Sequence, residues 1–99
     1  MHNSHSVHDD DTELYELNNK EVVNFLYNEL IFLDLFYEDA SHKFQKELIK
    51  EKITKFEELI KLIKAFDINL SDEDCEILMT YAFRSVFKIL TLLDMELLN

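Results

Sequence analysis

Residues 71–98 read SDEDCEILMTYAFRSVFKILTLLDMELL, and this stretch decides the fold class of the chain. Ser71 followed three residues later by Asp74 is typical of a capping box, and acids in a first turn are favoured by the helix dipole. Apolar residues then recur every three or four positions as far as Leu98. The pattern predicts one helix from Asp72 to about Leu98, roughly 40 Å long.

The preceding segment, which ends at about Phe66, has the pattern of an ordinary amphipathic helix with one buried face. The polar residues Asp67, Asn69 and Ser71 separate it from the helix that follows. Its expected apolar stripe consists of Ile49, Ile53, Phe56, Ile60 and Ile63.

A further helix is expected from Asn18 to about Glu38, because Asn18 with Glu21 three residues later resembles another capping box. The segment 38–42 is the weakest boundary in the chain. Asp39 or Ser41 could cap a new helix there, although no residue forbids the helix from continuing. We place a break in this segment.

The chain contains neither glycine nor proline, the residues on which hairpin turns and tight loops depend. Its 99 residues suffice for one modest core. We therefore expect an all-α fold: a flexible His/Asp-rich tail over residues 1–11 and a single bundle of three long helices over residues 12–99. In an alternative arrangement, Leu14, Tyr15 and Leu17 form a short N-terminal fourth helix that folds back on the bundle.

The first and third of these long helices are apolar around more than half of their circumference, which is more than a three-helix core can bury. The surplus must be covered by the N-terminal segment, by a second copy or by a partner. A homodimer is the first expectation, since helical homo-oligomers are most often two-fold symmetric. The residues expected on this apolar surface are Phe25, Phe32, Phe36, Met79, Phe83, Phe87 and Leu90.

Charge is unevenly distributed, with 21 acidic and 10 basic residues giving a net charge of -11. Seven lysines and four acids between Lys43 and Lys64 make that segment net +3, so the rest of the chain is net -14. We expect the lysines to face the acidic helices of the same bundle, and the overall negative field argues against direct nucleic-acid binding. The acids most suited to a basic partner are Asp9, Asp10, Asp11, Glu13, Glu16, Asp72, Glu73, Asp74 and Glu76.

Candidate chemistry is sparse. Without glycine there is no phosphate-binding loop, and we expect neither enzymatic activity nor a cofactor. Glu38 or Asp39 with His42 could share a metal ion, but helical metal sites need such a motif twice, so polar residues at a helix end are the better interpretation. His2, His5 and His8 beside three aspartates are interpreted as a solvated tail. Cys75 is interpreted as a buried apolar thiol, and the acids from Asp72 to Glu76 as a capped helix start.

A single cysteine, a polar N-terminus and the lack of a clean apolar run of about 18 residues indicate a cytoplasmic protein that does not enter membranes. In size, acidity and lack of motifs the chain resembles toxin-immunity proteins, antitoxins and phage-encoded anti-defence proteins. The leading hypothesis is stoichiometric binding to a basic surface of a target protein, as an inhibitor or regulator, with a nucleic-acid mimic as a sharper version. The alternative is a structural subunit that dimerises or joins a larger assembly.

Overall fold

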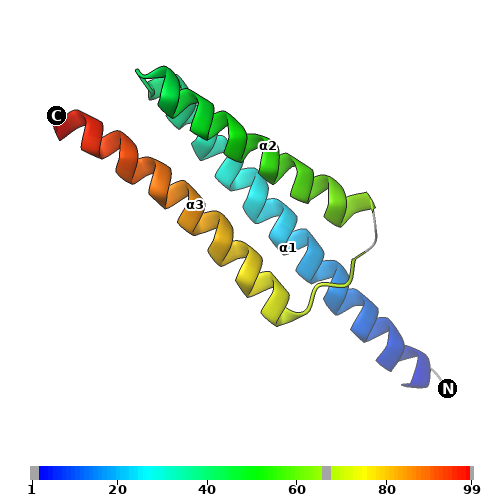
Figure 1. Ribbon diagram of the computed structural model, residues 1–99. Coiled ribbons are helices and arrows are strands. Elements are labelled where there is room, and N and C mark those ends of the chain that lie inside the picture. Colours follow the sequence, from blue (N-terminus) through cyan, green and yellow to red (C-terminus); the bar gives the residue numbers. More distant parts are fainter. Residues whose placement is uncertain (1–2, 66–67, 99) are drawn as a thin grey trace.

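Three α-helices packed side by side form the computed structural model of the chain (Figure 1). The structure describes the backbone of residues 3–65 and 68–98, and the side chains of residues 17–65 and 68–94. α1 spans Asn3–Asp39, α2 spans Lys43–Ala65 and α3 spans Asp72–Leu98. The predicted all-α bundle of three long helices is confirmed, as are the break after α1 and the bounds of α3. Within the described residues, no helix combines the length and the apolar composition needed to cross a membrane.

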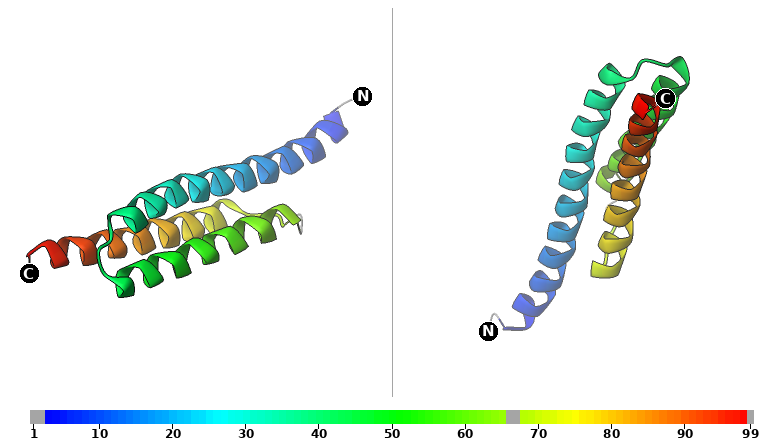
Figure 2. Two further views of the ribbon diagram at one scale, coloured as in Figure 1. Left: turned by 90° about the horizontal axis from the view of Figure 1, so that it is seen from above. Right: turned by 90° about the vertical axis from the view of Figure 1, so that its left-hand side faces the viewer.

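The helices run up, down and up, so that α1 and α3 are parallel and α2 is antiparallel to both (Figure 1). The N-terminal part of α1 projects beyond the ends of the other two helices (Figure 2). α1 packs along both α2 and α3, whereas an open groove separates much of α2 from α3. α1 is therefore the helix that holds the bundle together.

The core takes its buried apolar side chains from all three helices. On α2, four residues of the predicted stripe are buried and Ile53 is half-buried, which confirms the amphipathic pattern. The ring of Phe56 packs edge-on against Tyr81 of α3, with ring centroids 6.2 Å apart. The side chains with the least exposure are Val22, Leu26, Leu33, Ile49, Phe56 and Ala82.

The predicted start of the first helix at Asn18 is wrong. α1 begins at Asn3, and Asn18 lies within it. No glycine or proline interrupts residues 3–18, so the backbone has no reason to leave the helix there. The Asn18 side chain does not cap α1; its amide bonds to residues at the start of α3, more than fifty positions away.

The backbone of α1 is continuous across residues 11 and 12, between which the sequence suggested a boundary between tail and bundle. The flexibility predicted for residues 1–11 stays a prediction, and residues 1–2 lie outside the described residues. Leu14 and Tyr15 belong to the α1 backbone, so the described part of the chain contains three helices and no separate fourth helix folded against them.

α1 ends without the glycine that commonly terminates a helix. The Ala40 amide donates to the Phe36 carbonyl oxygen (2.9 Å), and the ammonium of Lys46 donates to the carbonyl oxygen of Tyr37 (2.9 Å). A cation at this position also interacts favourably with the negative end of the helix dipole. The Lys46 ammonium thus caps the C-terminal end of α1 and ties the start of α2 to it.

Two asparagines of α1 hold the link between α2 and α3. Asn18 Nδ2 donates to the Leu70 carbonyl oxygen (2.9 Å) and to Asp72 Oδ1 (3.1 Å). Asn19 Nδ2 donates to the Ile68 carbonyl oxygen, and its Oδ1 accepts the Leu70 amide at 3.3 Å. These bonds satisfy backbone groups within residues 68–71, which form neither helix nor strand.

The predicted capping box at the start of α3 is confirmed. The Asp74 amide donates to Ser71 Oγ (3.1 Å), and the Ser71 amide donates to Asp74 Oδ2 (3.2 Å). The reciprocal pair satisfies two amides at the helix N-terminus.

Candidate functional site

The most prominent surface feature is an apolar face shared by α1 and α3, here called the aromatic face. Its most exposed rings are Phe83 and Phe87, each 57% exposed, and Phe32, which is 49% exposed. Leu90 is exposed, while Phe25, Phe36 and Met79 are half-buried against the core. The aromatic face consists of the seven residues expected from the sequence: Phe25, Phe32, Phe36, Met79, Phe83, Phe87 and Leu90.

These residues share one side of the molecule because of their angular positions on the two helices. Successive residues of a helix are separated by roughly 100°. On α3, Phe83 and Phe87 lie roughly 100–140° from the core position Ala82, whereas Tyr81 lies on the opposite flank and packs toward α2. The aromatic face is therefore on the side of α3 that points away from α2.

The same reasoning applies to α1. Its α2-facing flank carries Tyr27 and Tyr37, which contact Lys64 and Lys46 of α2. Phe32 lies on the other flank, beside α3. The aromatic residues of the two helices thus line a common seam on the outside of the α1–α3 pair.

The register of the two parallel helices brings these aromatic residues to the same level. Cys75 Sγ of α3 lies 3.6 Å from the Asn18 carbonyl oxygen of α1, so residues at the same level on the two helices differ by about 57 in number. This register places Phe32 beside the C-terminal part of the Phe83–Phe87 pair. Phe83 and Phe87 are stacked, with centroids 6.2 Å apart and planes 18° apart. On α1, Phe32 and Phe36 form a second pair, with ring centroids 6.5 Å apart.

Acidic residues border the aromatic face near its two ends. These are Glu21 and Asp39 on α1 and Asp72 and Asp94 on α3, and all four are exposed. The basic residues of α3, by contrast, line the groove on its other flank. An apolar face with acidic residues near its ends suits a partner surface that is apolar at its centre and basic around it.

A buried carboxylic acid lies beneath the aromatic face. Glu29 of α1 is 8% exposed and occupies the core-facing stripe between Leu26 and Leu33. Its burial raises the pKa of the Glu29 carboxyl above the usual value. In the sequence, the spacing of Glu29 from Leu26 and Leu33 is the signal that it faces inward.

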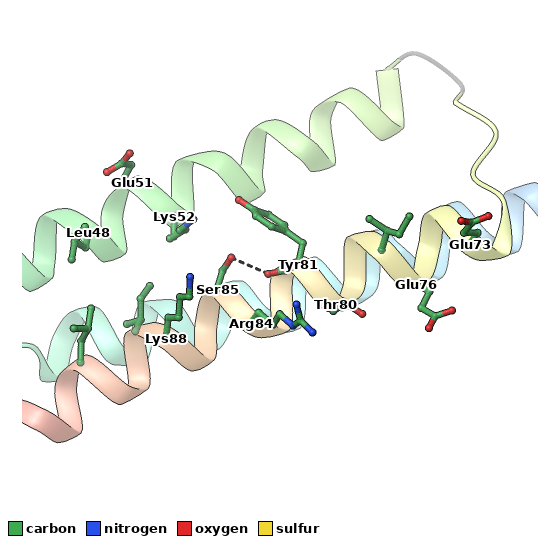
Figure 3. A pocket seen from close by; sticks show the side chains of 13 residues that line it. Leu48, Glu51, Lys52, Glu73, Glu76, Thr80, Tyr81, Arg84, Ser85 and Lys88 are labelled. Carbon is green, nitrogen blue, oxygen red and sulfur yellow. Dashed lines mark hydrogen bonds between the residues drawn. The ribbon is translucent and has the colours of Figure 1, made fainter.

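The second candidate site is the groove between α2 and α3, which encloses about 1070 Å³ (Figure 3). Tyr81 reaches from α3 toward α2, and the ammonium of Lys52 lies 5.4 Å from the centre of its ring. The charges balance, since three acidic and three basic side chains line the groove. Its lining residues are Leu48, Glu51, Lys52, Glu73, Glu76, Ile77, Thr80, Tyr81, Arg84, Ser85, Lys88, Ile89 and Leu92.

Each of the lysines on α2 for which the structure gives a side-chain contact meets a tyrosine. Lys46 lies 4.5 Å from the centre of the Tyr37 ring, and Lys64 donates to the Tyr27 hydroxyl (3.0 Å). These three lysines face the other two helices, as expected, but they meet aromatic rings and tyrosine oxygens. The other four lysines of α2 are exposed: Lys43, Lys50, Lys55 and Lys61.

The acids expected to contact a partner fall into two groups. Asp72 and Asp74 are exposed, and each also accepts a hydrogen bond that fixes the start of α3. Glu73 and Glu76 are exposed and line the groove. The side chains of Asp9, Asp10, Asp11, Glu13 and Glu16 lie outside the described residues.

Cys75 is buried, as expected for a small apolar side chain. Burial raises the pKa of its thiol, and the negative charges of Glu21, Asp72 and Asp74 raise it further. A thiol with a raised pKa is a poor nucleophile because little of it is ionised.

The residues weighed as metal ligands do not converge in the described part of the chain. Glu38, Asp39 and His42 are exposed at the end of α1 and in the link that follows. Among the described residues, no three histidine, cysteine or acidic side chains gather into a group that could hold a metal ion. The side chains of His2, His5 and His8 lie outside the described residues.

Comparison of the chain with protein-family models, with curated proteins and with solved structures found no match.

Proposed function

We propose that this chain is a non-enzymatic, acidic protein-binding module that acts by stoichiometric binding to the basic surface of a target protein. The observation that carries the proposal is the aromatic face, an exposed apolar surface with acidic residues near both of its ends. Inhibition or regulation of that target follows from occupying its basic surface, as in immunity proteins, antitoxins and anti-defence proteins.

The energetics of the aromatic face favour a role in binding. Covering the exposed half of a phenylalanine ring removes on the order of 100 Å² from water, which contributes about 2–3 kcal/mol per ring. Phe32, Phe83 and Phe87 each offer such an area. Large aromatic side chains clustered at the centre of an interface commonly carry most of its binding energy.

The acidic residues near the ends of the aromatic face favour a different protein over a second copy of this chain as the partner. In a two-fold symmetric dimer, each copy would present the same face, so these acidic residues of both copies would approach each other. Like charges at an interface oppose association, whereas a basic partner would gain in association rate and specificity. The alternative function is structural, as a dimer or as an assembly subunit of a larger complex, and the dimer makes the opposite prediction about oligomeric state.

The test is affinity capture from an extract of the native host, followed by binding measurements with the purified captured protein. The informative variant is Phe83→Gln with Phe87→Gln, which removes two exposed rings and keeps good helix-forming residues. The matched control is Phe44→Gln on α2, where the ring is 67% exposed and distant from the aromatic face.

We expect wild type and Phe44→Gln to bind one basic protein at a ratio of one to one, and the double variant to bind it at least tenfold more weakly. Affinity should also fall as salt is raised, because the acidic residues near the aromatic face act through screened charges. Equal affinity for all three proteins, or a tight dimer in light scattering that binds nothing further, would contradict the proposal.

A further inference from the structure

Two of the buried polar side chains lack part of their hydrogen bonding. Gln45 Oε1 on α2 is buried without a partner, and Glu29, which is 8% exposed, has neither a hydrogen-bond donor nor a cation beside it among the residues that the structure describes. Asn18 and Ser85 do have partners: Asn18 donates two hydrogen bonds, and Ser85 donates to the Tyr81 carbonyl oxygen (2.9 Å). The Glu29 carboxyl oxygens keep some contact with water, yet burial of the side chain disfavours its charged form and raises its pKa.

The surroundings of Glu29 are aromatic. Phe25 and Phe32, one turn to either side on α1, are its neighbours on the same helix face. The register offset of 57 residues places Glu29 opposite Val86 of α3, between the levels of Phe83 and Phe87. Glu29 thus lies on the side of α1 next to α3, with residues of the aromatic face on its outer side.

Cations of the chain itself are held elsewhere. Lys46, Lys52 and Lys64 of α2 are each positioned over a tyrosine ring, and Arg84 and Lys88 line the groove on the opposite flank of α3. The remaining five lysines lie on α1 and α2, are exposed and have no contact with Glu29: Lys20, Lys43, Lys50, Lys55 and Lys61. We therefore expect a cation that reaches Glu29 through the aromatic face to come from another molecule.

We infer that Glu29 is the anchor for an arginine side chain of the partner, whose guanidinium enters between Phe32 and the Phe83–Phe87 pair and binds the carboxylate. This inference rests on the proposed function and names the residue that would select the partner. Arginine fits better than lysine because its planar guanidinium stacks on aromatic rings, binds a carboxylate with two parallel hydrogen bonds and loses less hydration on burial.

The test uses isothermal titration calorimetry of the full chain with two synthetic probes, acetyl-octaarginine amide and acetyl-octalysine amide. The informative variant is Glu29→Gln, which keeps the shape of the side chain and removes its charge. Glu38→Gln is the matched control, since it removes one charge from an exposed glutamate on the same helix. Titrations at physiological ionic strength screen the exposed acids and leave a buried pair largely intact.

We expect octaarginine to bind wild type and Glu38→Gln within a factor of two, and Glu29→Gln about tenfold or more weakly, as is typical when one member of a buried charge pair is lost. Octalysine should bind wild type more weakly than octaarginine does. Circular dichroism should show that Glu29→Gln is folded and at least as stable as wild type, which separates lost binding from lost structure.

Two other results have distinct meanings. If Phe83→Gln with Phe87→Gln loses octaarginine binding but Glu29→Gln behaves like Glu38→Gln, the aromatic face binds cations without Glu29, and the inference is overturned while the proposed function stands. If octaarginine binds wild type no more tightly than it binds the double phenylalanine variant, the aromatic face does not select basic partners, and both proposals fail.

Discussion

The role of Asn18 can be tested sharply, because a helix cap and a clamp on a distant link respond differently to the same substitutions. In the structure the Asn18 amide is a donor, 2.9 Å from the buried carbonyl oxygen of Leu70 and 3.1 Å from Asp72 Oδ1. A side chain at a helix N-cap is an acceptor, and aspartate serves there as well as asparagine. Asn18→Asp therefore separates the two roles.

The magnitude follows from the groups left without a partner. Asn18→Ala removes the donor from a buried carbonyl, which costs about 1–3 kcal/mol, and also removes a hydrogen bond to a charged carboxylate. Allowing for the better helix propensity of alanine, we expect a loss of about 2–3 kcal/mol and a fall in Tm of about 10–20 °C. Asn18→Asp should lose more, because it places a second carboxylate beside Asp72 in a buried position.

Urea unfolding followed by circular dichroism measures both variants, and Asn24→Ala is the control. Asn24 is exposed on the same helix, so its substitution reports helix propensity alone and should change the free energy of unfolding by less than about 0.5 kcal/mol. Asn18 is not a clamp on the link if Asn18→Asp is as stable as wild type, or if Asn18→Ala matches Asn24→Ala.

Three further outcomes follow from burial and charge. Glu29→Gln should be more stable than wild type at pH 7. Because the folded-state pKa of Glu29 is raised above 4.5, the wild-type chain loses stability as pH rises through that raised pKa. In urea titrations, the difference in stability between Glu29→Gln and wild type should therefore shrink as the pH is lowered toward 4.5. Cys75 should react with a thiol reagent at pH 8 far more slowly in the native chain than in urea, since the thiol is buried and its pKa is raised; equal rates would contradict this. Phe56→Ala should cost about 3–5 kcal/mol in the free energy of unfolding, whereas Phe44→Ala, at a largely exposed ring, should cost less than about 1 kcal/mol.

The parts of the fold that were predicted from the sequence are those that depend on neighbouring residues. The capping box at Ser71 and Asp74 involves groups three residues apart, and the stripe on α2 is a repeat within one helix. The error at Asn18 has a different origin. An asparagine at a cap and an asparagine inside a helix look alike in sequence, and the bond that distinguishes them joins residues 52 positions apart.

For the candidate sites too, features of a single helix were predicted, whereas features that depend on how two helices pack were not. The aromatic face was expected from surplus apolar residues on two helices, and four of its seven members are exposed. The groove between α2 and α3 was not expected, because it depends on how the two helices diverge. The tyrosine contacts of Lys46 and Lys64 were also missed, since they depend on the pairing of α1 with α2.

Glu29 connects the stability of the chain to its proposed binding. A leucine or methionine at this position would extend the apolar stripe of Leu26 and Leu33 and avoid the cost of burying a charge. The unpaired carboxylate lowers the free energy of unfolding of the free chain. A bound cation removes this destabilisation, so the destabilisation of the free state adds to the affinity for a basic partner. Glu29→Leu should therefore unfold at higher urea than wild type and bind octaarginine more weakly, and a variant that gained both stability and affinity would show that the carboxylate has no part in recognition.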